Sequence, residues 1–155
     1  MTANSDNLKL KYLANSCLID VYWDNEAFNE ELLEIAIENQ GFAEQGTDTV
    51  MKKQAVFDLA YAYSQLGKYT LALDTYQEAI KYQLIEGNHS VSASYNNMAN
   101  IYVNLEQFDS AIHYFKKAEK EAILERRQNG VAASNFYLGQ VYNIEENARK
   151  SPVLL

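Results

Sequence analysis

The sequence predicts an all-α protein of about seven helices, arranged as antiparallel pairs in a single domain over residues 1–155. Apolar residues recur three and four positions apart in successive segments, as they do along one face of a helix. One proline and six glycines in 155 residues leave long helices uninterrupted and disfavour an architecture rich in β-turns. The apolar pattern of residues 59–79 also returns about 40 residues later, which indicates a stacked array.

Taken in order, the segments with this periodicity predict seven helices separated by short breaks. The expected helices cover about residues 8–23, 26–44, 49–66, 69–86, 91–105, 108–128 and 131–147. The breaks contain residues that favour turns or helix caps: Asp24-Asn25, Gly46-Thr47-Asp48, Gly67, Gly87-Asn88-His89-Ser90, Glu106-Gln107 and Asn129-Gly130. Gly67 tolerates the positive φ that a turn needs, and Asn129-Gly130 is expected to close the sixth helix as a left-handed C-cap. Pro152 then prevents a continuation of the last helix.

Net charge is −8, and all of it lies in the N-terminal third of the chain. Residues 1–50 contain ten acidic residues and only two basic ones, Lys9 and Lys11. Such a surface repels nucleic acid phosphates and anionic lipid, so we expect neither nucleic acid nor a membrane as a partner. The acidity serves solubility, or it provides a docking surface for a basic partner.

Other features predict a cytoplasmic location. The chain has no run of about 18 apolar residues and no hydrophobic signal core near its N-terminus. Its single cysteine, Cys17, excludes an intrachain disulfide and fits a reducing compartment. Because Cys17 lies among Leu13, Leu18 and Ile19 on an expected helix, we predict a buried structural thiol.

No pattern of catalytic or metal-binding residues is present. The two histidines, His89 and His113, have no second ligand at a metal-site spacing. The sequence also lacks a glycine-rich phosphate loop and a GxSxG motif. Arg126-Arg127 lies at an expected helix C-terminus, where cations interact favourably with the helix dipole. We therefore expect a protein that is not an enzyme and has no cofactor.

An internal repeat accounts for most of the chain. Residues 59–79 align with residues 98–118 at an offset of 39, and this offset superposes Ala60 on Ala99, Tyr63 on Tyr102, Ala72 on Ala111, Tyr76 on Phe115 and Ala79 on Ala118. The small residues allow two helices to approach closely, and the aromatic residues fill the space between adjacent helix pairs. One helix pair cannot bury both of its faces, so such repeats must stack.

These positions resemble the tetratricopeptide repeat family over about 130 residues. Residues 53–86 match its pattern well, and residues 92–128 match although Glu106 replaces the turn glycine. Residues 132–147 match a first helix only, and residues 12–45 form a degenerate copy. The period of 39–41 exceeds the usual length of 34. It is similar to the longer repeats of Rap-type regulators, Pins-type adaptors and bacterial sensory modules. The resemblance implies a right-handed superhelix of antiparallel helix pairs.

The resemblance also implies a peptide-binding groove lined by the first helix of each repeat. Carried over to this chain, the groove residues are Phe57, Tyr61, Gln65, Asn96, Asn97, Asn100, Asn104, Phe136, Gln140 and Asn143. Asn96, Asn100 and Asn104 are four residues apart and therefore lie on one helical face. Asparagine disfavours helix interiors, but its amide matches the C=O and N–H groups of an extended peptide. The alternative is a solvent-exposed face that happens to be rich in asparagine.

The expected function is that of a non-catalytic module that binds a protein or peptide, as an adaptor or as a regulatory or sensory domain in signalling. The expected groove set contains no lysine or arginine, which favours neutral or mixed ligands. One alternative is a self-associating module that forms a homodimer through its terminal helices. In that case Tyr137, Leu138, Val141 and Tyr142 would be exposed on the last helix. The other alternative is a secretion-type chaperone.

Overall fold

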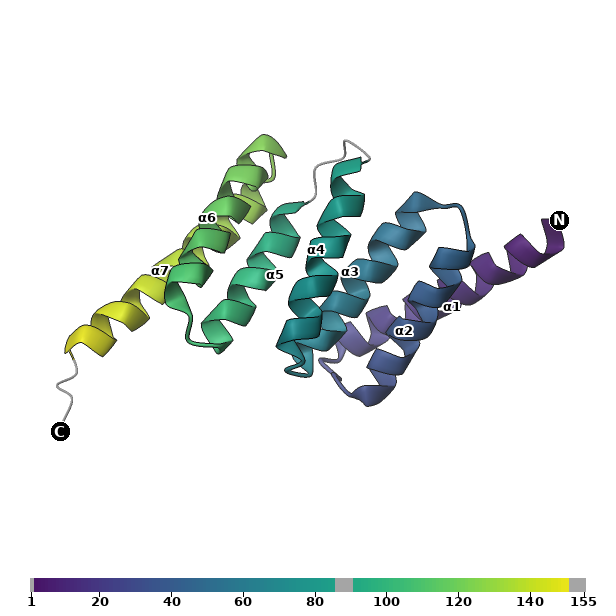
Figure 1. Cartoon of the computed structure of the whole chain (residues 1–155), viewed down its shortest axis with the longest axis horizontal. Coiled ribbons are helices and arrows are strands. Elements are labelled where there is room, and N and C mark those ends of the chain that lie inside the picture. The colour runs from purple at the N-terminus through teal and green to yellow at the C-terminus, as the bar shows by residue number, and fades with distance from the viewer. Residues whose placement is uncertain (1, 86–90, 151–155) are drawn as a thin grey trace. The chain divides into compact units, whose positions relative to one another are not determined.

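A computed structural model describes residues 2–85 and 91–150, and all regular structure in these ranges is α-helical. The helices are α1 (Thr2–Asp24), α2 (Glu30–Gln45), α3 (Thr49–Gln65), α4 (Tyr69–Ile85), α5 (Val91–Asn104), α6 (Phe108–Leu124) and α7 (Gln128–Lys150). Figure 1 shows that helices α1 to α4 run antiparallel to their neighbours in the chain, and that the same holds among α5, α6 and α7. The predicted all-α class and the predicted order of helices are therefore confirmed. The expected turn at Gly87-Asn88-His89-Ser90 and the expected stop at Pro152 lie outside the described residues.

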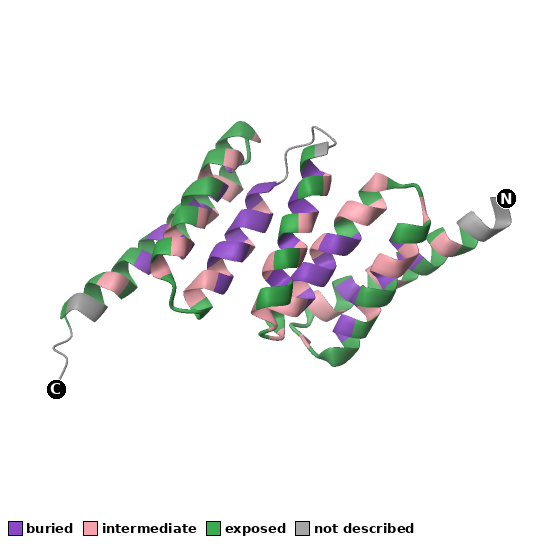
Figure 2. Cartoon of the chain, viewed as in Figure 1, coloured by how far each residue is buried: buried purple, intermediate pink, exposed green. Residues whose placement is uncertain are grey.

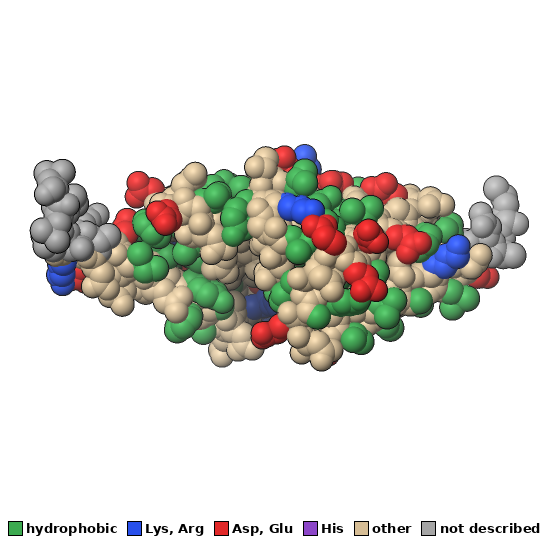
Figure 3. All heavy atoms as spheres, turned by 90° about the horizontal axis from the view of Figure 1, so that it is seen from below, with side chains coloured by type: hydrophobic (Ala, Val, Ile, Leu, Met, Phe, Trp, Pro, Cys, Tyr) green, Lys and Arg blue, Asp and Glu red, His purple; other side chains and the backbone are tan. Residues whose placement is uncertain are grey.

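The helices form two compact units. The N-terminal unit, Met1–Ile85, contains α1 to α4, and the C-terminal unit, Glu86–Leu155, contains α5 to α7. Figure 3 shows many acidic side chains on the visible surface of the N-terminal unit, which agrees with the charge distribution along the sequence.

The start of α2 differs from the prediction. This helix begins at Glu30, because Asn29 has extended backbone (φ −143°) and its Oδ1 accepts a hydrogen bond of 2.9 Å from the backbone N–H of Leu32. Asn25, part of the expected cap, instead donates its side-chain amide to the carbonyl of Val21 at 2.7 Å. At the next boundary the prediction is confirmed, since the Asp48 carboxylate caps α3.

Four connections between helices share one turn, with a residue of positive φ one position beyond the helix C-cap. These residues are Glu26 (φ 50°), Gly67 (φ 70°), Glu106 (φ 57°) and Arg126 (φ 55°). At the glycine turn the N–H of Lys68 donates to the carbonyl of Tyr63 at 2.9 Å, and equivalent bonds close the other three. The turn therefore places a residue in the left-handed conformation at this position even where the sequence has no glycine.

The end of α6 was predicted wrongly. Arg126 adopts the left-handed conformation, and Gly130 lies inside α7. A Cβ atom on Gly130 would lie 3.0 Å from the Cβ of Ala122 on α6 and 3.7 Å from the Oγ of Ser92 on α5. Gly130 therefore allows helices to approach closely and does not act as a cap.

Each unit has a buried core (Figure 2), and this core contains most of the small and aromatic residues that the repeat predicted. Each of them is 0% exposed: Ala60, Ala72, Tyr76 and Ala79 in the N-terminal unit, and Ala99, Ala111, Phe115 and Ala118 in the C-terminal unit. Close helix contact at alanine and space filling at the ring explain why these positions repeat.

Two predictions about exposure were wrong. Leu138 and Val141 on α7 are only 7% and 1% exposed, because α7 packs on α6 and joins the core around Phe115. Tyr142 is 45% exposed, as predicted. Cys17 is exposed, because the inward face of α1 contains Tyr12 and Ile19, on the other side of the helix.

A buried carboxylate lies between α1 and α3 in the N-terminal unit. Asp58 is 4% exposed and accepts a 2.8 Å hydrogen bond from Nε2 of Gln54. Burial raises the pKa of Asp58 to about 7, since desolvation disfavours the ionised form. The bond from Gln54 opposes this rise in pKa, and the nearby Asp20 carboxylate adds to it.

Candidate functional site

The ten residues predicted for a groove lie on three helices of the two units. Phe57, Tyr61 and Gln65 are on α3, the four asparagines are on α5, and Phe136, Gln140 and Asn143 are on α7. The first group therefore belongs to the N-terminal unit and the other two belong to the C-terminal unit.

The two aromatic residues on α3 are half-buried in the packing of the N-terminal unit. The Tyr61 ring lies 4.6 Å from the ring of Trp23 and 5.7 Å from that of Phe28. The Phe57 ring meets the buried Tyr76 ring edge-on at 5.7 Å. Both rings thus stabilise contacts between helices, whereas Gln65 is exposed.

A hollow of about 300 Å³ in the C-terminal unit brings three of the predicted asparagines together. It lies between α5 and the N-terminal half of α7, together with the turn before α7. Its lining residues are Ser92, Ala93, Asn96, Asn97, Asn100, Arg127, Asn129, Gly130, Ala133 and Tyr137. The other predicted residues of this unit are exposed and lie outside the lining: Asn104, Phe136, Gln140 and Asn143.

The asparagines on α5 differ in their surroundings. Asn96 is 9% exposed, and its Oδ1 is 3.0 Å from the Oγ of Ser134 on α7, which donates the hydrogen bond. Asn97 and Asn100 are half-buried in the hollow, and Asn104 is exposed beyond it. Asn96 therefore ties the two walls together, and Asn97 and Asn100 are the amides of α5 that line the opening.

The residues that the α6–α7 turn contributes to the hollow were not predicted from the sequence. Arg127 was expected at the end of a long sixth helix, but that helix ends at Leu124 and the turn places Arg127 beside α5. The expectation that no cation lines the groove was therefore wrong for this hollow. Asn129 and Tyr137 were missed for a related reason: the predicted helix start and face were shifted.

A buried carboxylate balances this arginine. The Glu125 side chain is 1% exposed, and its Oε2 lies 3.9 Å from Nη1 of Arg127. The same carboxylate accepts hydrogen bonds from the backbone N–H of Ser92 at 3.1 Å and from its hydroxyl at 2.6 Å. Glu125 therefore caps the first turn of α5 from the end of α6, where a negative charge interacts favourably with the helix dipole.

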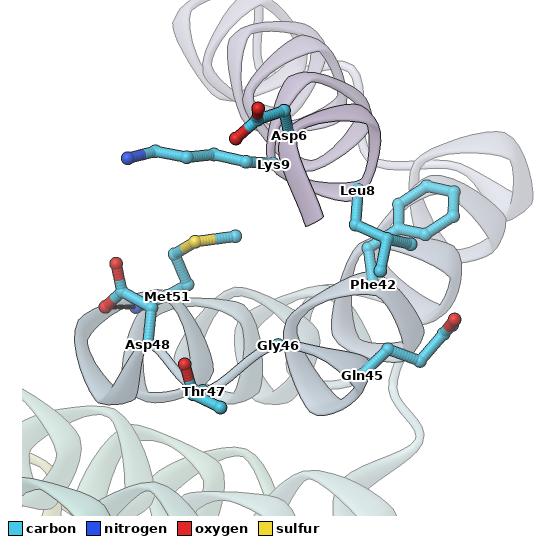
Figure 4. Close-up of a pocket in the computed structure, with 9 residues that line it drawn as sticks. All are labelled: Asp6, Leu8, Lys9, Phe42, Gln45, Gly46, Thr47, Asp48 and Met51. Carbon is cyan, nitrogen blue, oxygen red and sulfur yellow. Dashed lines mark hydrogen bonds between the residues drawn. The ribbon is translucent and has the colours of Figure 1, made fainter. Parts of the chain in front are cut away.

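Two other hollows have a different character. A smaller one of about 170 Å³ in the N-terminal unit has Leu8, Phe42 and Met51 in its lining, with Lys9 and Asp48 beside them (Figure 4). Asp48 is already engaged there, since its Oδ1 accepts from the backbone N–H of Val50 at 2.9 Å. A third hollow of about 360 Å³ beside the α5–α6 turn is lined by acidic side chains: Glu106, Asp109 and Glu145.

Residues 2–85 and 91–150 show neither a cluster of metal ligands nor a membrane-spanning helix. These residues contain no group of three or more His, Cys, Asp or Glu side chains that could hold a metal ion. Within the same ranges, no helix has the length and apolar character needed to span a membrane.

Comparisons with known proteins identify the repeat. The family model described as tetratricopeptide repeat matches residues 54–122, which cover most of the α3–α4 and α5–α6 pairs. A search of curated proteins finds no match. Among solved structures the chain is similar to BtubC (BKLC) from P. vanneervenii, with 23% sequence identity and a TM-score of 0.71.

The likeness to BtubC is one of fold, given the low sequence identity. It covers 92% of this chain but 59% of BtubC, so this chain spans about three fifths of that protein's length. Tetratricopeptide repeats generally mediate interactions between proteins. Residues 54–122, with their buried alanine and aromatic positions, therefore match the tetratricopeptide repeat family.

Proposed function

We propose that this chain is a non-catalytic module that binds an extended peptide segment of a partner protein in the hollow between α5 and α7. The observation that carries the proposal is the lining itself, in which the amides of Asn97, Asn100 and Asn129 surround one opening. We propose a role as an adaptor or sensory domain in a cytoplasmic regulatory assembly, because family members that bind peptides serve such assemblies.

The chemistry of the lining favours a peptide backbone as the ligand. Each asparagine amide offers donors and an acceptor, which pair with the C=O and N–H groups of an extended chain. The Tyr137 ring adds an apolar surface with a polar edge. Half-buried amides are also partly removed from water. A ligand that replaces their remaining hydrogen bonds to water therefore loses little binding free energy through desolvation.

The charges around the hollow favour a neutral segment. Arg127 brings a positive charge to the lining, but the buried Glu125 carboxylate at 3.9 Å offsets it. An acidic C-terminus would need an excess of positive charge to compensate for its desolvation. The net charge of −8 also supports the absence of nucleic acid and anionic membranes among the ligands.

The structure indicates which substitutions test the proposal. Asn96 holds Ser134 across the two walls, so its removal would alter both the scaffold and the opening. Asn97 and Asn100 line the opening and are half-buried. Asn97→Ala combined with Asn100→Ala is therefore the informative variant.

The experiment is a selection of random peptides displayed on phage against the immobilised chain, followed by fluorescence anisotropy on the enriched peptides. We expect Asn97→Ala/Asn100→Ala to weaken binding of these peptides at least about tenfold, since each lost hydrogen bond costs on the order of 1 kcal/mol. Asn104→Ala is the matched control, because it lies on the same helix face outside the hollow. The affinity of the Asn104→Ala variant for the enriched peptides should stay near that of the wild type.

Two results would contradict the proposal. The first is a selection that enriches no peptide for the folded chain. The second is a set of enriched peptides whose affinity falls equally in the double variant and in the Asn104→Ala control, which would place binding elsewhere. Far-UV circular dichroism of each variant checks that the helices remain intact.

A further inference from the structure

The outer face of α1 is apolar although it faces solvent. Leu10, Leu13, Leu18 and Val21 are 67%, 46%, 47% and 56% exposed, and Cys17 is exposed among them. On the other side of the same helix Tyr12 and Ile19 are 6% and 1% exposed, because they pack in the N-terminal unit. Hydrophobic side chains are visible on the surface of this unit in Figure 3. We call Leu10, Leu13, Ala14, Cys17, Leu18 and Val21 the α1 strip.

Part of the exposed surface of α7 is polar, unlike the α1 strip. Along the outer face of α7 the exposed residues Gln140, Asn143 and Asn147 follow Phe136. The α1 strip lacks this character, and an exposed apolar strip of this kind marks an interaction surface.

The α1 strip has the spacing of a helix-pairing seam. Leu10, Ala14, Cys17 and Val21 are separated by four, three and four residues, which is the repeat that keeps one stripe against a partner helix. The strip is also symmetric about the midpoint between residues 15 and 16. Reversing the helix exchanges its members in pairs: Leu10 with Val21, Leu13 with Leu18, and Ala14 with Cys17. A two-fold interface requires this kind of self-complementarity.

The charges beside the strip favour the same antiparallel arrangement. Lys9 and Asp20 are 11 residues apart, about three helical turns, so both exposed side chains lie on one flank of α1. In an antiparallel pair centred on the strip, Lys9 would lie within about 3 Å along the axis of the partner's Asp20. Two-fold symmetry makes this contact twice. The other basic residue, Lys11, lies over the Phe42 ring at 5.4 Å on the opposite flank.

We propose that two copies of this chain associate through antiparallel pairing of their α1 helices. The occupant of the α1 strip is a second copy, because the apolar pairs and the charges of Lys9 and Asp20 are complementary to their own reversed order. The pairing leaves the hollow between α5 and α7 outside the interface, since that hollow belongs to the C-terminal unit. Each dimer would then present two such hollows.

Sedimentation equilibrium across a wide range of concentrations tests this proposal. We expect a reversible monomer–dimer equilibrium for the wild type, and monomer only for Leu13→Glu and for Val21→Glu. Phe136→Glu is the matched control, because it introduces the same charge at a residue that is 62% exposed on α7. That variant should dimerise as the wild type does.

Charge reversal tests the antiparallel register. Lys9→Glu or Asp20→Lys alone replaces two attractive contacts by two repulsive ones, so each should raise the dimer Kd about tenfold. The double variant restores opposite charges in the swapped order and should return the Kd to near that of the wild type. A double variant weaker than either single variant would overturn the proposed register.

The single cysteine provides an independent check of geometry. Cys17 lies near the two-fold axis, so a short bismaleimide should alkylate one thiol from each copy and link them covalently. Cys17→Ser should abolish the cross-link. A wild-type chain that stays monomeric at every concentration would overturn the proposal. So would a dimer that persists in both Leu13→Glu and Val21→Glu, because another surface would then form it.

Discussion

Replacing the buried Asp58 by asparagine should stabilise the N-terminal unit at neutral pH and remove much of its pH dependence. Asp58 is 4% exposed and has one amide donor, Gln54, at 2.8 Å. Burial raises its pKa to about 7 from a usual value of 3.8, so folding disfavours the ionised form. Asparagine keeps an oxygen that accepts the bond from Gln54 but has no charge to desolvate.

The sign of the effect follows from where the proton is bound. Below pH 3.8 Asp58 is protonated in both the folded and the unfolded chain, and its burial does not affect the pH dependence. Between about pH 4 and pH 7 only the folded chain holds the proton, so the free energy of unfolding falls as pH rises. Above about pH 7 Asp58 is ionised in both the folded and the unfolded chain, and the free energy of unfolding falls no further on its account. The gap between the two pKa values corresponds to about 4 kcal/mol.

Urea unfolding followed by Trp23 fluorescence measures this effect in the N-terminal unit, which contains both Trp23 and Asp58. Trp23 is the single tryptophan of the chain, and its ring packs against Tyr61 on α3 at 4.6 Å. The wild type should be less stable at pH 8 than at pH 5. Asp58→Asn should approach equal stability at both values and exceed the wild type at pH 8. Asp74→Asn, an exposed acid on α4, is the matched control and should keep the wild-type slope.

A wild-type free energy of unfolding that does not fall between pH 5 and pH 8 would contradict the raised pKa of Asp58. An Asp58→Asn variant whose stability depends on pH as that of the wild type does would also contradict the raised pKa. In either case the carboxylate of Asp58 would be ionised in the folded chain at pH 5, in conflict with its burial.

Two further predictions concern glycine positions. Glu106→Gly should raise the free energy of unfolding by about 1 kcal/mol, because φ is 57° there, and Gly67→Ala should lower it by a similar amount at φ 70°; thermal unfolding followed by circular dichroism measures both. Gly130→Ala should lower stability by about 1 kcal/mol, since its new Cβ would be 3.0 Å from Ala122, whereas Gly139→Ala on the same helix should raise it by about 1 kcal/mol. Equal effects of the last two substitutions, measured by urea unfolding, would contradict the packing role of Gly130.

Much of the helix order could be predicted because the relevant physics is local. The starts of α3, α4 and α5 agree with the predicted ones at Thr49, Tyr69 and Val91, where a turn is followed by a clear helical pattern. The start of α2 was missed, because both Asn25 and Asn29 are suitable caps and only the fold decides which of them caps the helix.

The candidate site was predicted in part. The family register predicted Asn97 and Asn100 for the groove, and both line the hollow. Arg127 and Tyr137 were missed, because their position depends on where α6 ends and how α7 packs back on α5. Neither feature follows from the periodicity of a single segment.

The sequence by itself determined the fold class, the repeat, and which residues share a helical face. Helical spacing and the alternation of small and aromatic residues, as at Ala60 and Tyr76, act over one or two turns and are visible in the chain. The tertiary structure decided which of these faces is covered. Val141 is buried and Cys17 is exposed because a neighbouring helix packs on one face of each helix and leaves the other open. That choice depends on contacts between residues far apart in the chain, so a local pattern does not determine it.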